Sequence, residues 1–420
     1  MAAIGLSGRR KLSMGEVEMI ISAHEKLAVG RPGGRRAVLK FVDLTGFNFA
    51  GRNLADADFS GSVLDGAKLA GTNLERANLF GCDLRQADLR GAKLARADLR
   101  GACLRGANLT LADLTQADLR VGQISLPHPS KGLTSLIHKS REGQLDEAVL
   151  AGATLDGSQL AEVTAFAADF RDCSLRGAKM AGANCRGANM SGAFLDGADV
   201  AGANLEGANL SQASLDGVDV RSARISDATN LTGAVAAPTA EAIAKAPELL
   251  ARALANHAWV TTGGKEGRPA NFDGEDLRVL RDKLKGMKLT AMSAKGAVMV
   301  GLDLSGAHLQ GANLDEADLR GANLRGADMR GARLLQANLS KADLGEACLA
   351  PLPLGARETP SSLVAARLRY ANAQCCDFTG AHLDGADFSG CDLAGARLKG
   401  ASLKGADLDT ALGLTEAIAA

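Results

Sequence analysis

Apolar residues recur at every fifth position through most of the chain. Around Asp88 the sequence reads ADLRG AKLAR ADLRG, and a Leu or Phe centre recurs without a skip from Leu44 to Leu119. Two residues before each centre lies a small residue such as Ala87, while the other three positions are polar or glycine. A period of five fits neither a helix nor a strand. It predicts a square coil with four five-residue sides, whose centres and small residues face inward.

The A-(D/N)-L-x-x pattern resembles the pentapeptide repeat family. The resemblance implies an all-β solenoid, a right-handed quadrilateral β-helix whose turns stack on one another. Four runs carry the pattern, with centres at 44–119, 145–225, 289–349 and 363–408. Glycine is frequent two residues after the centre, as at Gly61 and Gly91, where a corner needs backbone freedom.

The interruptions of the pattern predict the domain organisation. All nine prolines lie outside the four runs, as expected of a residue that cannot donate to a ladder. The predicted parts are an N-terminal helical cap (1–39), a first β-helix (40–231, interrupted by a loop at 120–144), a helical linker and cap (232–276), and a second β-helix (277–420, interrupted by a loop at 350–362). We expect two tandem modules with short α-helical caps that form distinct bodies; the alternative is one continuous stack with the second helix looped out.

Each module begins with a predicted cap. The first helix is expected over 14–27, opened by a capping box of Ser13 and Glu16, with an apolar stripe from Met14 to Leu27. The second is expected over 240–260 with a break at Pro247. An ungapped alignment of 24–39 with 257–272 pairs the two histidines and their glycine-rich loops, and we expect each histidine to bond a loop carbonyl. The predicted structural cap residues are His24, His257, Gly34, Gly267 and Trp259.

Composition excludes several classes of function. Net charge is zero and aromatic residues are only 3% of the chain, which disfavours direct nucleic-acid binding and carbohydrate platforms. No segment is apolar enough to span a membrane, and the N-terminus lacks the apolar core of a secretory signal, so we expect a cytoplasmic protein. The Gly263–Gly267 segment lacks the spacing of a phosphate loop. No catalytic constellation, metal cluster or cofactor site is expected, and cysteines such as Cys82 replace inward alanines.

The charge distribution and the long loop indicate candidate partner-binding residues. Residues 1–144 hold 21 basic and 14 acidic side chains, whereas residues 145–227 hold 6 and 12. A polarised surface of this kind can orient a partner. The apolar residues of the loop either pack back onto the coil or contact a partner. The candidates are Ile124, Leu126, Leu133, Leu136 and Ile137 of the loop, the basic Arg100, Arg105 and Arg120, and the acidic Asp196, Glu206 and Asp216.

These features favour a non-enzymatic protein-interaction scaffold built from two rigid coils. Some members of the pentapeptide repeat family bind DNA gyrase or topoisomerase IV as duplex-DNA mimics, which implies a dimeric rod with an acidic face. This chain departs from that pattern because it has no net negative charge, repeats the coil in tandem and begins with a basic run. Topoisomerase modulation is the alternative function, and the oligomeric state stays open, a homodimer included. Weak nucleic-acid binding by the basic N-terminal region is a third hypothesis.

Overall fold

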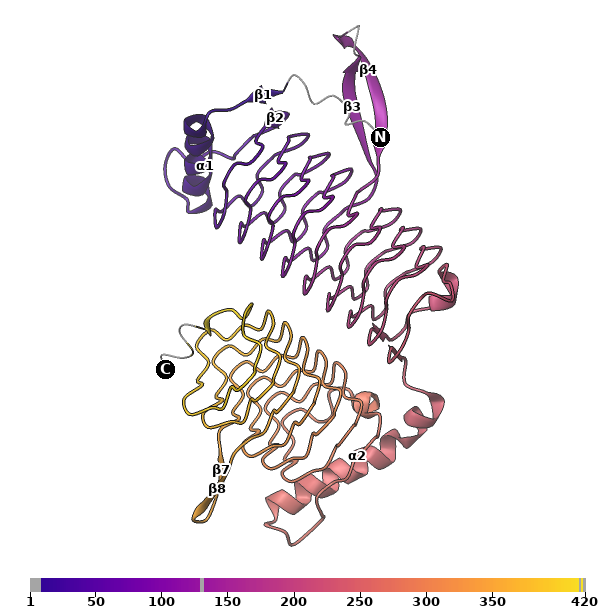
Figure 1. The fold of residues 1–420 in the computed structure, drawn as a ribbon, viewed down its shortest axis with the longest axis vertical. Helices are drawn as coiled ribbons and strands as arrows, with labels where there is room; N and C mark the ends of the chain where they lie inside the picture. Colours follow the sequence, from indigo (N-terminus) through magenta and orange to yellow (C-terminus); the bar gives the residue numbers. More distant parts are fainter. Residues whose placement is uncertain (1–8, 129–131, 415–416, 418–420) are drawn as a thin grey trace. The chain divides into compact units, whose positions relative to one another are not determined.

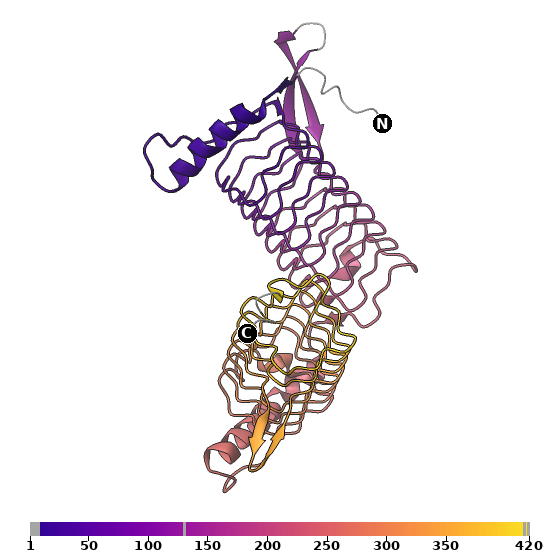
Figure 2. The same cartoon turned by 60° about the vertical axis from the view of Figure 1, so that its left-hand side comes forward.

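The structure is a computed structural model that describes residues 9–128, 132–414 and 417. For residues 124–128 and 132–140 it describes the backbone only. The chain divides into two compact units, unit 1 up to Ala237 and unit 2 from Pro238 (Figure 1). Each unit is a coil of stacked turns with a long helix at the start of its chain (Figure 2).

The coil is held together by a parallel ladder with a step of twenty residues. Asp88 is bridged to Lys68 on one side and to Asn108 on the other. The Leu89 N–H donates to the Asn108 carbonyl at 2.7 Å, and the Ala92 N–H closes a turn onto the Leu89 carbonyl at 3.0 Å. Residues twenty apart therefore share one face. This pattern confirms the β-helix that the five-residue period predicted.

The corners need a left-handed backbone whether or not they carry glycine. Gly91 has φ 61°, as the sequence pattern predicted. Arg76, Gln86 and Arg96 occupy the same position two residues after their centres, with φ between 54° and 58°. The turn geometry is therefore imposed by the ladder on both sides of the corner, and side chains with a Cβ adopt it although they rarely do so elsewhere.

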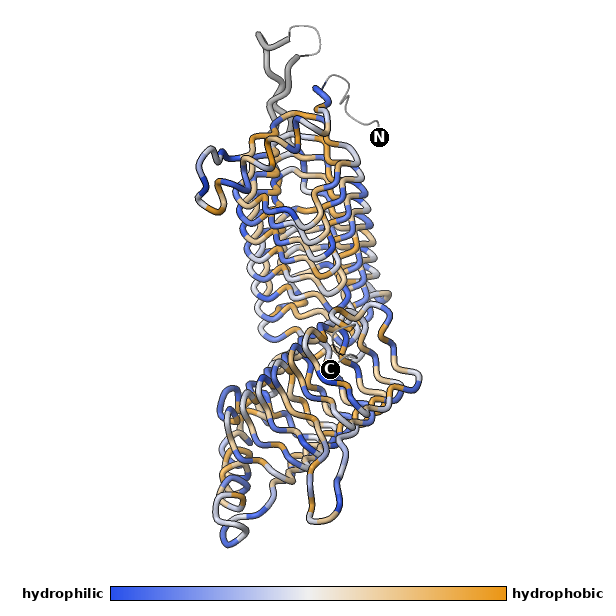
Figure 3. Tube along the Cα trace, turned by 90° about the vertical axis from the view of Figure 1, so that its left-hand side faces the viewer, coloured by the Kyte–Doolittle hydropathy of each residue, from blue (hydrophilic) through white to orange (hydrophobic). Residues whose placement is uncertain are grey.

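Two separate hydrophobic cores fill the coils. The core of unit 1 runs from Leu12 to Leu215, and that of unit 2 from Leu249 to Ala417. Centres and small residues such as Leu89 and Ala87 are fully buried. Figure 3 shows the resulting alternation of hydrophobic and hydrophilic residues along the turns.

Short elements outside the ladder mark the ends and the interruptions of the coils. In unit 1 they are β1 (Arg10–Lys11), α1 (Met14–Ala28), β2 (Val42–Asp43), β3 (Gly122–His128), β4 (Gly132–Arg141), β5 (Ser214–Leu215), the 3-10 helix η1 (Val220–Ser222) and β6 (Val235–Ala236). In unit 2 they are α2 (Ala240–Thr261), the 3-10 helix η2 (Leu277–Leu280), β7 (Leu352–Leu354) and β8 (Arg357–Thr359). Strand β1 pairs in parallel with β2, and β5 with β6, whereas β3–β4 and β7–β8 are antiparallel hairpins at the two predicted loops.

The helices differ from the sequence prediction in two respects. The predicted break at Pro247 is wrong, since α2 is continuous through it. A proline cannot donate to the carbonyl four residues before it, and both Pro247 and Ile243 lie on the exposed side of the helix. In α1 the capping box of Ser13 and Glu16 is present. Its predicted apolar stripe is only partly buried, because Met14 at its start is exposed.

Candidate protein-interaction surface

The first interruption of the coil is a hairpin that leaves unit 1 at one corner. The ladder passes from Cys103 directly to Gln144, a step of 41 residues in place of twenty, so 21 residues are inserted. Strands β3 and β4 pair with Leu126 opposite Ile137. The backbone of the predicted contact residues Ile124, Leu126, Leu133, Leu136 and Ile137 lies in these strands, whereas their side chains lie outside the described part of the structure.

The base of the hairpin packs closely on a corner lined with glycine. A Cβ added at Gly122 would lie 2.9 Å from the carbonyl group of Arg100, and one added at Gly101 would lie 3.2 Å from the Gly122 Cα. The Arg141 guanidinium donates to the Gly81 carbonyl at 3.3 Å, one turn closer to the N-terminus. The hairpin thus follows the corner toward the first turns of the coil, and this close approach requires glycine.

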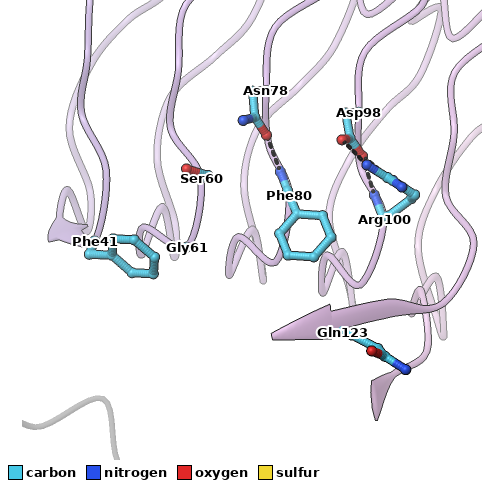
Figure 4. Close-up of a pocket in the computed structure, with 8 residues that line it drawn as sticks. All are labelled: Phe41, Ser60, Gly61, Asn78, Phe80, Asp98, Arg100 and Gln123. Carbon is cyan, nitrogen blue, oxygen red and sulfur yellow. Dashed lines mark hydrogen bonds and ion pairs between the residues drawn. The ribbon is translucent and has the colours of Figure 1, made fainter. Parts of the chain in front are cut away.

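A hollow of about 360 Å³ opens beside this corner (Figure 4). Two phenylalanines form its apolar wall, Phe41 with 53% of its surface exposed and Phe80 two turns further on. The Arg100 guanidinium carbon lies 5.5 Å from the centre of the Phe80 ring, within the range of a cation–π contact. The lining residues are Phe41, Ser60, Gly61, Asn78, Phe80, Asp98, Arg100 and Gln123.

The arginine of the hollow is already paired with a carboxylate. The Arg100 Nη2 lies 2.7 Å and its Nε 2.9 Å from the two carboxylate oxygens of Asp98. These hydrogen bonds raise the pKa of Arg100 above its ordinary value. Arg120, on the same face one turn on, makes the same two-residue pairing with Asp118 at 2.8 Å. At these two arginines, the basic surplus that the sequence indicated for residues 1–144 is therefore balanced by neighbouring aspartates.

The remaining charged candidates do not converge on one site. Arg105 lies on the next face and pairs with Asp146 at 3.2 Å. Glu206 shares that face, several turns away, and pairs with Arg224 at 3.0 Å. Asp196 and Asp216 are one turn apart on a third face, where the Asp216 N–H donates to Asp196 at 3.3 Å.

His24 accepts a hydrogen bond in the first cap, and in the second cap the corresponding bond is made by Asn256, not by His257 as the sequence alignment implied. The ring Nδ1 of His24 accepts the N–H of Ala37 at 3.0 Å, so it bonds an amide and not the loop carbonyl we expected. In unit 2 the N–H of Ala270 donates at 2.9 Å to the side-chain oxygen of Asn256. The ungapped pairing of His24 with His257 is therefore wrong by one residue. His257 accepts the Lys288 N–H at 3.2 Å instead.

Both predicted cap glycines lie against the helix that precedes them. A Cβ at Gly34 would lie 2.4 Å from the Leu27 nitrogen, and a Cβ at Gly267 would lie 1.9 Å from the Ala255 carbonyl oxygen. The Trp259 indole lies beside Gly264, where an added Cβ would approach its Nε1 to 3.4 Å. Glycine is therefore needed for the loop to fold back on the helix.

In the described part of the chain, no group of three or more His, Cys, Asp or Glu side chains has an arrangement that could hold a metal ion. Among the described helices, none combines the length and the apolar character that a membrane crossing needs.

Sequence reasoning missed the two phenylalanines of the hollow. Phe80 follows its centre by one residue and Phe41 follows by two, so both stand at outward positions that are mostly polar or glycine elsewhere. In a chain with 3% aromatic residues, two outward phenylalanines near one corner were the available signal. Their closeness depends on the twenty-residue step, which places Phe80 near residues 41 and 61.

Comparisons with known proteins identify the repeat. Overlapping matches to a family model described as pentapeptide repeats cover residues 35–120, 144–233, 284–350 and 361–411. The chain belongs to the pentapeptide repeat family. No curated protein matches it.

Two solved structures illustrate the neighbours of this pentapeptide repeat chain. HetL, a pentapeptide repeat protein involved in heterocyst differentiation regulation from the cyanobacterium Nostoc sp. strain PCC 7120, is 20% identical, with 96% of this chain and 98% of that chain covered and a TM-score of 0.20. A trypsin-treated form of QnrB1, a plasmid-mediated fluoroquinolone resistance protein, is 18% identical, with 51% of this chain and 96% of that chain covered and a TM-score of 0.30. These scores are low, so neither neighbour carries an argument about this chain.

Proposed function

We propose that the chain is a non-enzymatic protein-interaction scaffold whose partner-binding surface is the hollow and the hairpin base of unit 1. In this proposal both coils are right-handed tandem modules that work in the cytoplasm of a bacterium. Unit 1 recognises a protein partner through Phe41, Phe80 and Arg100. The β3–β4 hairpin gives this surface a shape that the regular faces lack.

The observation that carries the proposal is the contrast between this corner and the rest of the first coil. On the regular faces, arginines pair with the aspartate two residues before them, as Arg90 does with Asp88 at 2.8 Å. Such paired, exposed charges offer little net attraction. Beside the hairpin Arg100 is paired in the same way, but two phenylalanine rings line a concave surface together with its guanidinium. Aromatic residues, phenylalanine included, and arginine are enriched in the buried centres of protein interfaces.

The test is affinity capture with matched variants of the full chain. Replacing 120–144 by a short linker, or Phe41 and Phe80 by serine, is expected to remove the same partners from the captured set. Phe166→Ser is the control, because Phe166 is 46% exposed on another face. Partners that persist in both the hairpin and the phenylalanine variants would overturn the proposal.

Topoisomerase modulation is the alternative function, and it rests on the family resemblance described above. Its structural support is limited to the column of Asp196 and Asp216, in which Asp196 is also paired with Arg176 at 3.2 Å. Purified protein that changes neither gyrase supercoiling nor topoisomerase IV decatenation would remove this alternative. Inhibition that is lost in an Asp196→Asn, Asp216→Asn variant would favour it over the hollow.

A further inference from the structure

The first turn of a coil lacks a preceding turn to pair with, and in unit 1 strand β1 and helix α1 together take its place. Within the coil, the small residue closes a turn onto the preceding centre, as the Ala57 N–H does onto the Leu54 carbonyl at 3.1 Å. No such centre precedes Ala37, and the Nδ1 of His24 accepts its N–H. The neighbouring Glu25 accepts the Asn53 N–H at 3.4 Å. His24 and Glu25, which are consecutive in α1, therefore accept hydrogen bonds from two different faces of the first turn.

This hydrogen bond fixes the state of the imidazole. Because Nδ1 accepts an N–H, it carries no hydrogen, and the hydrogen of the neutral ring is on Nε2. The ring is only 3% exposed, and within the described residues no group accepts a hydrogen bond from Nε2. Protonation would set an N–H of the ring against the Ala37 N–H and bury a charge. Both changes oppose the docked position of the helix.

The charged groups around the ring offer no compensation for that charge. Asp56, on the coil, is close enough for the charge of His24 to affect it, but its carboxylate accepts two hydrogen bonds from Arg76, at 2.8 and 2.7 Å. In the loop before the first turn, the Arg36 guanidinium donates to the Asp56 carbonyl. On α1 itself, Glu25 is held by Arg52 at 2.8 Å. Both of these carboxylates are therefore already paired with an arginine guanidinium, and neither is left to pair with a charged His24.

Unit 2 provides the contrast. Its corresponding donor, the Ala270 N–H, is accepted by Asn256, whose amide does not titrate and whose Nδ2 also donates to the Thr290 carbonyl at 3.1 Å. His257, which accepts the Lys288 N–H, is half-buried, so its ring is open to water as the ring of His24 is not.

We propose that α1 is a proton-responsive cap of unit 1, held down by neutral His24 and released when the ring gains a proton. The docked cap needs the neutral ring, so the capped state is favoured at neutral pH. It is lost as the pH falls and the ring gains a proton. Release uncovers Val17, Ile21 and the part of the first turn that β1 does not cover, and this edge can then pair with another strand. The cap of unit 2 responds less, because Asn256 holds its Ala270 N–H.

Hydrogen exchange of the full chain at pH 7.5 and 5.5 tests the proposal, with each rate divided by that of the unfolded peptide at the same pH. At pH 5.5 we expect residues 14–28 to open about tenfold more often, the effect of losing one buried hydrogen bond, and residues 240–261 to change much less. His24→Asn should keep α1 docked and remove the difference. Asn256→His should create a pH response in α2.

Two outcomes would overturn the proposal. One is a wild-type α1 whose corrected exchange is the same at both pH values. The other is His24→Asn protein that keeps the wild-type response. If His24→Asn does not fold, the Asn256→His variant decides, because an α2 that remains insensitive to pH shows that a buried cap histidine does not sense protons here.

Discussion

Truncating one central leucine measures how strongly the stacked turns depend on their inward column. Leu89 is fully buried, between the centres Leu69 and Leu109 of the turns on either side. Its own N–H is fixed to the next turn at 2.7 Å. Because ladders on both sides hold the turn spacing, the column cannot collapse to fill the space that Leu89→Ala leaves. The cost should therefore reach the upper part of the range known for such cavities, about 3–5 kcal/mol.

The measurement is urea unfolding combined with hydrogen exchange, so that the loss can be assigned to one unit. We expect Leu89→Ala to lower the free energy of unfolding of unit 1 and to leave the exchange of unit 2 unchanged. Arg90→Ala is the control next to it, since Arg90 is 60% exposed in its pair with Asp88, and an exposed pair contributes under about 1 kcal/mol. Leu324→Ala is the matched cavity in unit 2, between Leu304 and Leu344.

The reasoning fails if Leu89→Ala costs no more than Arg90→Ala, because inward and outward positions would then be energetically equal. It also fails if Leu89→Ala and Leu324→Ala each destabilise both units equally, because the two cores would then behave as one.

Three further predictions concern the cap, the hairpin and the thiols. A hydrogen bond from Arg52 lowers the pKa of Glu25, so this pair stabilises the cap above the carboxyl's unfolded-state pKa, and the stabilisation is lost as pH falls below about 4. An acid titration followed by circular dichroism should therefore show unfolding at a higher pH midpoint for Arg52→Met than for the wild type. An unchanged midpoint would contradict this. Gly122→Val should displace the hairpin base, because a Cβ at position 122 would lie 2.9 Å from the backbone of the coil. Limited proteolysis should then cut within 122–141 while the coil stays resistant. A variant hairpin as resistant as that of the wild type would argue against close packing. Burial raises the pKa of the Cys82 thiol to about 12, whereas Cys375 is exposed. Iodoacetamide at pH 8 should therefore label Cys375 and should not label Cys82 until the chain unfolds. Equal labelling rates would refute the assignment of Cys82 to the core.

The period predicted the coil because each position repeats one environment. Leu89 and Ala87 are buried, and the corner at Gly91 is left-handed, for the same reason in every turn. The same logic did not reveal that Arg76 and Gln86 adopt the glycine conformation, because side-chain identity does not report the constraint that the ladder imposes.

The site was less predictable because it depends on contacts across turns and on one-residue offsets. The summed charge of residues 1–144 suggested a basic surface, yet Arg100 and Arg120 are each paired two residues away. The alignment paired His24 with His257, while the bonded atoms place Asn256 in its role. The cap helix can shift by one residue relative to the first turn of the coil, and the repeat pattern of the sequence does not record such a shift.

The most direct test of the proposed scaffold is quantitative affinity capture with wild-type protein, the Phe41→Ser, Phe80→Ser variant and the Phe166→Ser control. The account predicts partners that bind the wild type and the control equally and are depleted with the double variant, while circular dichroism shows the same fold for all three. Partners retained by the double variant, or lost equally with the control, would contradict a binding surface in the hollow of unit 1.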